Sequence, residues 1–188
     1  SDNIASAAYA VAVILKKSFD TYEEICIKIA DNNVKNDNLN VYPVSVSVMN
    51  REGLRNLYRI LTKRNCMWSI VPKSYLEAHR YGLLLGSSDT EGELYSMLIN
   101  DAATETVYAK TIFYDYVNLM TDRHAELLKE KNTIKTINEF RNFNKFLYKC
   151  AVECNVIAIA TCFSKDISKS EFMTTNEMLS EFSYLDKD

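Results

Sequence analysis

Residues 82–93 read Gly82-Leu83-Leu84-Leu85-Gly86-Ser87-Ser88-Asp89-Thr90-Glu91-Gly92-Glu93, and they hold three of the four glycines in a chain of 188 residues. The apolar run is short and bounded by turn residues, which predicts a buried strand. Thr90 can cap a following helix, with Glu91 and Glu93 in its first turn, where the helix dipole favours anions. Sites in α/β proteins form beyond the carboxyl ends of strands, so Asp89 stands at a candidate position. The alternative is an ordinary connecting loop with a good cap, which is the commoner case.

Strands and helices alternate on both sides of this stretch. The expected strands are Val41–Met49, Cys66–Val71, Leu83–Leu85, Ile112–Met120 and Val156–Thr161. The expected helices are Ile4–Lys17, Tyr22–Ala30, Glu52–Lys63, Ser74–His79, Gly92–Asn100, Ala102–Lys110, a helix from a Thr121 or Asp122 cap to Lys131, a helix from a Thr136 cap to Cys154, and Asn176–Phe182. The alternation predicts an α/β fold with mostly parallel short strands. Leu83–Leu85 and Val156–Thr161 are apolar on both faces, so we expect them to lie centrally.

The chain is expected to divide near residue 40. Residues 1–40 are predicted to form a helical segment that ends in an Asn/Asp-rich linker, 31–40, and residues 41–188 an α/β domain. Residues 4–15 are apolar all round and must be covered on more than one side. Because the linker gives this helix reach, we expect it to mediate self-association into a homodimer, with packing onto Leu54 and Leu57 as the alternative.

Composition narrows the functional classes. The net charge is −3, and the acidic and basic residues are interspersed, so we expect no basic stripe of the kind that follows a phosphate backbone. Five cysteines, Cys26, Cys66, Cys150, Cys154 and Cys162, show no disulfide framework and are interpreted as free thiols in a reducing cytoplasm. The only histidines, His79 and His124, are predicted to be solvated or capping, and no membrane span or signal peptide is expected.

Four stretches, in order along the chain, resemble one protein family. They are Asn50–Ile60 (NREGLRNLYRI), Val71–Ser74 with Gly82–Ser88 (VPKS and GLLLGSS), Phe113–Tyr116 (FYDY) and Phe172–Leu185 (FMTTNEMLSEFSYL). Together they resemble the polymerase-and-histidinol-phosphatase (PHP) domain in the C-type α subunit of bacterial DNA polymerase III. No single stretch suffices, but the ordered set is specific.

The resemblance implies where this chain stands within such a polymerase. Asp2-Asn3-Ile4-Ala5-Ser6 looks like the end of the inserted proofreading exonuclease, with Asp2 at its catalytic aspartate position. The chain would then continue into the second half of the PHP domain, with an incomplete (β/α) barrel-like fold. The family is a DNA-directed DNA polymerase with 3′–5′ exonuclease activity, but we expect this segment itself to be inactive. Its expected partner is the rest of the polymerase chain, and it would meet DNA only through that enzyme, in the cytoplasm.

The same resemblance implies a degenerate metal site. Intact PHP domains bind divalent metals through His, Asp, Glu and Cys, whereas here Asp89 occupies a family cysteine position and Glu93 is a further candidate ligand. Phe163 stands where the family has an acid or amide, and Lys165 where it has a ligand histidine. Phenylalanine offers no lone pair and protonated lysine accepts no bond, so we expect no bound metal or other cofactor.

Three functional readings follow. The first is a non-catalytic structural portion of a replicative polymerase. The second is a phosphoesterase or nuclease that uses Asp89 and Glu93 with a divalent cation. The third is an independent interaction module derived from the PHP fold. A polymerase core downstream in the same reading frame favours the first reading, and a stop codon after Asp188 with an upstream start favours the third.

Overall fold

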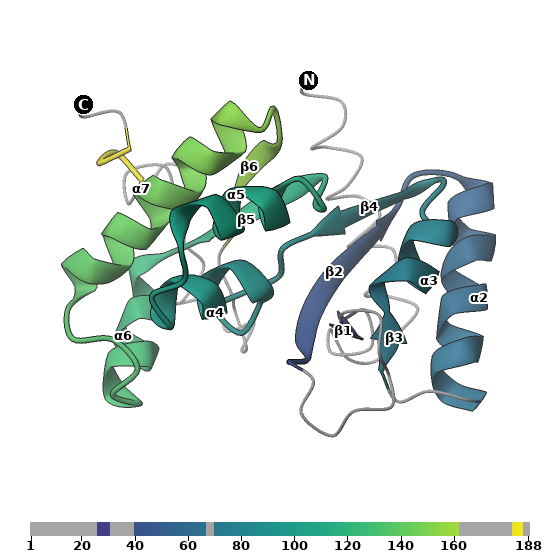
Figure 1. Ribbon diagram of the computed structural model, residues 1–188, viewed down its shortest axis with the longest axis horizontal. Helices are drawn as coiled ribbons and strands as arrows, with labels where there is room; N and C mark the ends of the chain where they lie inside the picture. The colour runs from purple at the N-terminus through teal and green to yellow at the C-terminus, as the bar shows by residue number, and fades with distance from the viewer. Residues whose placement is uncertain (1–25, 31–39, 67–69, 162–181, 186–188) are drawn as a thin grey trace, which may run out of the picture. The chain divides into compact units, whose positions relative to one another are not determined.

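The computed structural model describes residues 26–30, 40–66, 70–161 and 182–185, and the chain forms two compact units, Ser1–Ser88 and Asp89–Asp188 (Figure 1). The expected helix Ile4–Lys17 lies outside the described residues, as do residues 31–39 of the expected linker and all but the last residue of the expected helix Asn176–Phe182. The homodimer expected from the first helix therefore has no support in the structure.

Unit 1 contains a four-stranded sheet. Its strands are β1 (Cys26–Ala30), β2 (Tyr42–Val48), β3 (Val71–Pro72) and β4 (Leu83–Gly86), in the order β3-β1-β2-β4. β1 pairs parallel with β3, and β2 pairs antiparallel with both β1 and β4. Three of the four strands therefore run in the same direction, with β2 opposed. The α/β class and the mostly parallel layout are confirmed, and the described strands of neither unit close into a barrel.

β1 corrects the expected helix Tyr22–Ala30. Residues 26–30 form a strand whose register pairs Cys26 with Ser45 and Ile29 with Tyr42. The segment reads CIKIA, an apolar–polar alternation with period two that suits a strand. The threonine and glutamates upstream suggested a helix start, but pairing with β2 decides the conformation of these five residues. The expected strand Cys66–Val71 is also shorter than predicted, because α2 extends to Cys66 and β3 begins at Val71.

Two helices belong to the described part of unit 1. α2 (Arg51–Cys66) contacts β2, β3 and β4, and α3 (Lys73–Ala78) follows β3 directly. α2 buries Leu57 and Ile60 one turn apart and leaves Arg55 and Tyr58 exposed, which is the amphipathic pattern of a helix that covers one side of a sheet. Val44 and Val46 of β2 are buried and the intervening Ser45 is less so, as the alternation predicted.

The start of α2 lies against the turn that precedes β4. Asn50 caps the helix, since its Oδ1 accepts the Gly53 N–H at 2.9 Å. Asn56 donates from Nδ2 to the Tyr81 carbonyl at 2.9 Å, and the Met49 N–H donates to the Gly82 carbonyl at 2.9 Å. A Cβ on Gly53 would lie 1.8 Å from the Gly82 carbonyl oxygen. The two backbones can therefore approach this closely only because residue 53 has no side chain.

Unit 2 packs helices against two parallel strands. Its elements are α4 (Glu93–Ile99), α5 (Thr104–Thr111), β5 (Tyr116–Met120), α6 (Asp122–Glu130), α7 (Ile137–Glu153) and β6 (Ile157–Thr161). α7 contacts β5, β6, α4, α5 and α6, so it is the helix around which the unit packs (Figure 1). The predicted Thr136 cap is confirmed, because its side chain accepts the Glu139 N–H at 3.1 Å.

The expectation for Val156–Thr161 needs correction. Residues 157–161 do form β6, in parallel register with β5 from Tyr116↔Ile157 to Met120↔Thr161. None of its residues is buried, and Ile157 is 48% exposed. Among the described strands it ends the sheet order, with β5 as its neighbour, so apolar composition on both faces did not place it centrally. β4 has three buried residues of four, which agrees with the expected burial of Leu83–Leu85. No helix in the described part of the chain is long and apolar enough to cross a membrane.

Candidate functional site

Asp89, the acidic residue of the organising stretch, makes a local turn at the start of unit 2. Its Oδ1 accepts the Glu91 N–H at 2.9 Å, and its carbonyl accepts the Gly92 N–H at 2.9 Å. The first bond is that of an Asx turn, in which a short carboxylate stabilises the backbone that leads into a helix, and the second is the i to i+3 backbone bond of a β-turn. Asp89 is half-buried, and its charge acts on His124. The geometry of Asp89 fits the connecting-loop alternative named above.

Glu93, the second candidate ligand, lies inside unit 2 at the first position of α4. Its side chain is 3% exposed. One carboxylate oxygen, Oε2, accepts a 2.9 Å hydrogen bond from the hydroxyl of Tyr114, which is itself buried. The other, Oε1, lies 3.5 Å from the ammonium of Lys110 on α5. A buried carboxylate needs such partners, and here they come from two different segments that it holds to α4.

The described residues do not fit a divalent metal ion. A metal site in a protein needs several ligands that converge, usually with carboxylates turned toward an open position. Among the residues that the structure describes, no group of three or more His, Cys, Asp or Glu side chains could hold such an ion. Both oxygens of Glu93 already bind a hydroxyl and an ammonium within the protein. Asp2, Phe163 and Lys165 lie outside the described residues, so their predicted roles stay predictions.

His124 is buried rather than solvated, which corrects the sequence interpretation. It lies in the first turn of α6 with 6% of its surface exposed, and its Nδ1 is 3.2 Å from the Thr121 hydroxyl. Burial lowers the pKa of His124, because removal from water disfavours the imidazolium, while the negative charge of Asp89 acts in the opposite direction. His79 does sit at the end of its helix, at the C-cap of α3, with Nδ1 2.9 Å from the Tyr75 carbonyl.

The lowered pKa of His124 predicts that stability falls in mild acid. Between the folded-state pKa and the unfolded value of about 6.5, the unfolded chain binds more protons, so unfolding is favoured as the pH decreases through that window. We expect the wild type to lose more stability between about pH 7.5 and pH 5.5 than His124→Gln does, measured by urea unfolding at each pH. Equal losses in the two proteins would show that His124 does not carry the pH dependence.

The two cysteines of α7 do not form a metal site either. Both are free, Cys150 is buried, and burial raises its pKa to about 11. Cys154, one helical turn away, is partly exposed, and burial likewise raises its pKa. Two thiols are too few for a metal site, and among the described residues no further His, Cys, Asp or Glu completes a group of three with them. The interpretation of Cys150 and Cys154 as free thiols is confirmed.

A buried polar network in unit 2 was not found from the sequence. Asn144 is fully buried on α7; its Oδ1 accepts the Tyr95 hydroxyl, and its Nδ2 donates to the Met120 carbonyl at 2.9 Å and to the Tyr184 hydroxyl at 2.7 Å. The Met120 N–H donates to the Tyr95 hydroxyl at 3.0 Å. This network joins α4, β5, α7 and residues 182–185. One signal in the sequence could have indicated this network. Asn144 lies one turn after Phe140, so a polar residue falls on the apolar face of the helix predicted from the Thr136 cap.

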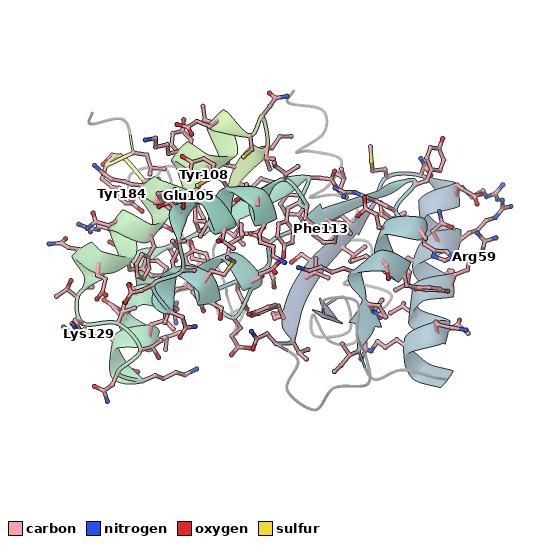
Figure 2. The ribbon with its side chains drawn as sticks, in the orientation of Figure 1. Arg59, Glu105, Tyr108, Phe113, Lys129 and Tyr184 are labelled. Carbon is pink, nitrogen blue, oxygen red and sulfur yellow. The ribbon has the colours of Figure 1, made fainter. Side chains whose placement is uncertain are left out.

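Several residues of the family resemblance have structural roles in this chain. In unit 1, Asn50 and Asn56 bind the backbone around α2, and Gly53 permits the contact with Gly82. In unit 2, Tyr114 binds Glu93, and Tyr184 binds Asn144 while the Arg141 guanidinium lies 5.6 Å from its ring centre (Figure 2). The residues that carry the resemblance are therefore residues that hold each unit together.

Comparison with known proteins supports the same family. No family model matches the chain. It is 28% identical over 213 aligned residues to the DNA polymerase III PolC-type of Caldanaerobacter subterraneus subsp. tengcongensis, covering 95% of this chain and 15% of the relative. The PolC-type enzyme of Clostridium perfringens is 26% identical, with 95% and 15% covered, and that of Streptococcus sanguinis 27% identical, with 77% and 12% covered. The resemblance to PolC-type DNA polymerase III is confirmed, and the chain spans about one seventh of the length of these relatives.

Proposed function

We propose that this chain is a structural, non-catalytic portion of a PolC-type replicative DNA polymerase III, equivalent to the second half of its PHP domain and preceded by the tail of the inserted exonuclease. The observation that carries this proposal is the alignment of 95% of the chain with a small part of PolC-type relatives. Nearly the whole of this chain aligns, but it aligns with only 15% of each of these two relatives. This is the pattern expected of one portion of a much longer enzyme.

The contacts of the motif residues support a structural role. Gly53 allows α2 to approach the turn before β4, and Asn56 binds the backbone of that turn. Glu93 accepts a hydrogen bond from Tyr114 and pairs with Lys110. A catalytic carboxylate must be able to reach substrate or a metal ion, whereas the side chain of Glu93 is almost wholly enclosed. The phosphoesterase reading, which needs Asp89 and Glu93 to share a cation, gains no support from this geometry.

The size and peptide content of the natural polypeptide test the assignment to a polymerase. Proteins of the source organism are separated by denaturing electrophoresis, and the peptides of each gel band are identified by mass spectrometry. We expect peptides from this segment and from a polymerase core in the same band, at the size of one long polypeptide. Peptides from this segment in a short polypeptide without a polymerase core would contradict the proposal and support an independent module.

A further inference from the structure

The outer side of α7 carries a groove of about 460 Å³ that is separate from the sites described above. Phe146, Tyr148 and Val152 line it from the helix, and Leu185 lines it from the segment 182–185, which lies beside α7 (Figure 1). We call this feature the α7 groove. None of its helical residues is among the buried residues of α7, so the groove lies on the side of the helix that faces away from the core.

The α7 groove exposes apolar surface over a length that suits a second helix. Val152 is 60% exposed and Tyr148 37% exposed, while Phe146 is half-buried. The residues that line the groove from α7 extend from Asn142 to Glu153, which is about 16 Å along the helix axis. That length corresponds to about three turns of a docked helix, whose apolar stripe would cover the exposed side chains.

Two lysines give this groove a charge opposite to that of its surroundings. The full sequence of unit 2 holds eleven basic and seventeen acidic residues. Lys145 and Lys149, one helical turn apart, both line the groove, and one acidic residue, Glu153, lines it with them. Glu153 lies 3.9 Å from Lys149, and it accepts a hydrogen bond from Tyr108 on α5, which raises the pKa of that tyrosine. The groove therefore combines apolar side chains with an excess of positive charge.

We propose that the α7 groove binds an acidic amphipathic helix of a partner protein, with apolar side chains against Phe146, Val152 and Leu185 and carboxylates beside the two lysines. Burial of the exposed apolar side chains supplies affinity, and the lysines select an acidic partner and orient it. A phosphate backbone would gain little here, because apolar residues outnumber the cations in the groove. This inference goes beyond the proposed structural role and does not depend on it, since the groove belongs to unit 2 itself.

A synthetic helix tests the proposal with the full chain. The probe is a fluorescein-labelled peptide of about 15 residues, with leucines at positions i, i+3, i+4 and i+7 and glutamates on both sides of that stripe. We expect the wild type to bind it with a dissociation constant on the order of 10 μM, measured by fluorescence anisotropy. A matched peptide with glutamines in place of the glutamates should bind about tenfold more weakly. A matched peptide with serines in place of the leucines should show no binding.

A pair of apolar variants locates the peptide on the protein. Val152→Ser is expected to weaken binding of the acidic peptide at least about fivefold, because it removes exposed apolar surface from the groove. The control Leu127→Ser changes an apolar residue of α6 that is 51% exposed and does not line the groove, and it should bind like the wild type. Far-UV circular dichroism of both variants confirms that the helices are still formed.

A pair of charge variants tests the role of the lysines. Lys145→Gln/Lys149→Gln is expected to weaken binding of the glutamate peptide about tenfold and to leave the weaker binding of the glutamine peptide unchanged. The control Lys129→Gln/Lys131→Gln removes the same charge from exposed positions of unit 2 outside the groove and should change neither affinity.

Four results would overturn the proposal. The first two are equal binding of the three peptides and equal losses in Val152→Ser and Leu127→Ser. The third is the absence of binding by the wild type; if Met178→Ser/Leu179→Ser then binds the peptide, the occupant of the groove is the chain's own segment 172–181. The fourth is a dimer in sedimentation that Val152→Ser dissociates, which would assign the groove to a second copy of this chain.

Discussion

Gly53→Ala is expected to destabilise unit 1 by about 3 kcal/mol or more, measured by urea unfolding. A Cβ at this position would lie 1.8 Å from the carbonyl oxygen and 2.4 Å from the carbonyl carbon of Gly82. Neither atom belongs to a flexible side chain, so the helix and the turn before β4 must separate. That separation also strains the Asn50 cap and the bond from Asn56 to the Tyr81 carbonyl.

The sign of this effect is informative. In an ordinary helical position, alanine in place of glycine stabilises by about 1 kcal/mol, because glycine loses more backbone entropy. Stabilisation by Gly53→Ala would therefore contradict the close approach of α2 and the turn. Arg55→Ala, on the exposed face one half-turn away, serves as the control and should change stability by no more than about 0.5 kcal/mol.

Asn144→Leu is expected to destabilise unit 2 by about 3 kcal/mol. The substitution removes the acceptor of the Tyr95 hydroxyl and the donor to the Met120 carbonyl, and both of these partners are buried. Each buried polar group left without a partner costs about 1–3 kcal/mol. Burial raises the pKa of Tyr95, so its hydroxyl cannot escape the cost by ionising.

A matched surface substitution isolates the network from helix effects. Lys149→Leu replaces an exposed side chain of the same helix, which is 3.9 Å from Glu153 in a solvent-exposed ion pair. It should change the free energy of unfolding by less than about 1 kcal/mol in thermal or urea unfolding. Equal effects from Asn144→Leu and Lys149→Leu would show that the network contributes little to the stability of unit 2.

Much of the fold follows from local patterns. The alternation of valines and serines in β2, the Thr136 cap of α7 and the amphipathic face of α2 each gave the right element. The errors arose where partners distant in sequence decide the structure. β1 became a strand because β2 pairs with it, and β6 is not buried because composition does not reveal how many neighbours a strand has.

The candidate site was only partly predictable for the same reason. Asp89 lies in the turn before α4 and Glu93 is the first residue of the helix, whereas the expected Thr90 cap is wrong, because Gly92 stands at the N-cap. Sequence spacing could not reveal that Glu93 turns inward to Tyr114, twenty-one residues away, and to Lys110. The full sequence of unit 1 holds eleven basic and eight acidic residues and that of unit 2 eleven basic and seventeen acidic residues, so the acidic excess of the chain comes from unit 2.

The metal content of the purified chain tests most directly whether Asp89 and Glu93 have a structural role or bind a metal ion. The purified chain is saturated separately with Mn²⁺ and Zn²⁺, dialysed, and assayed by elemental analysis, beside Asp89→Asn and Glu93→Gln variants. Because Glu93 is enclosed by Tyr114 and Lys110, we predict no stoichiometric metal in the wild type or in either variant. One equivalent of metal in the wild type that is lost in both variants would contradict this account and support a metal-dependent phosphoesterase.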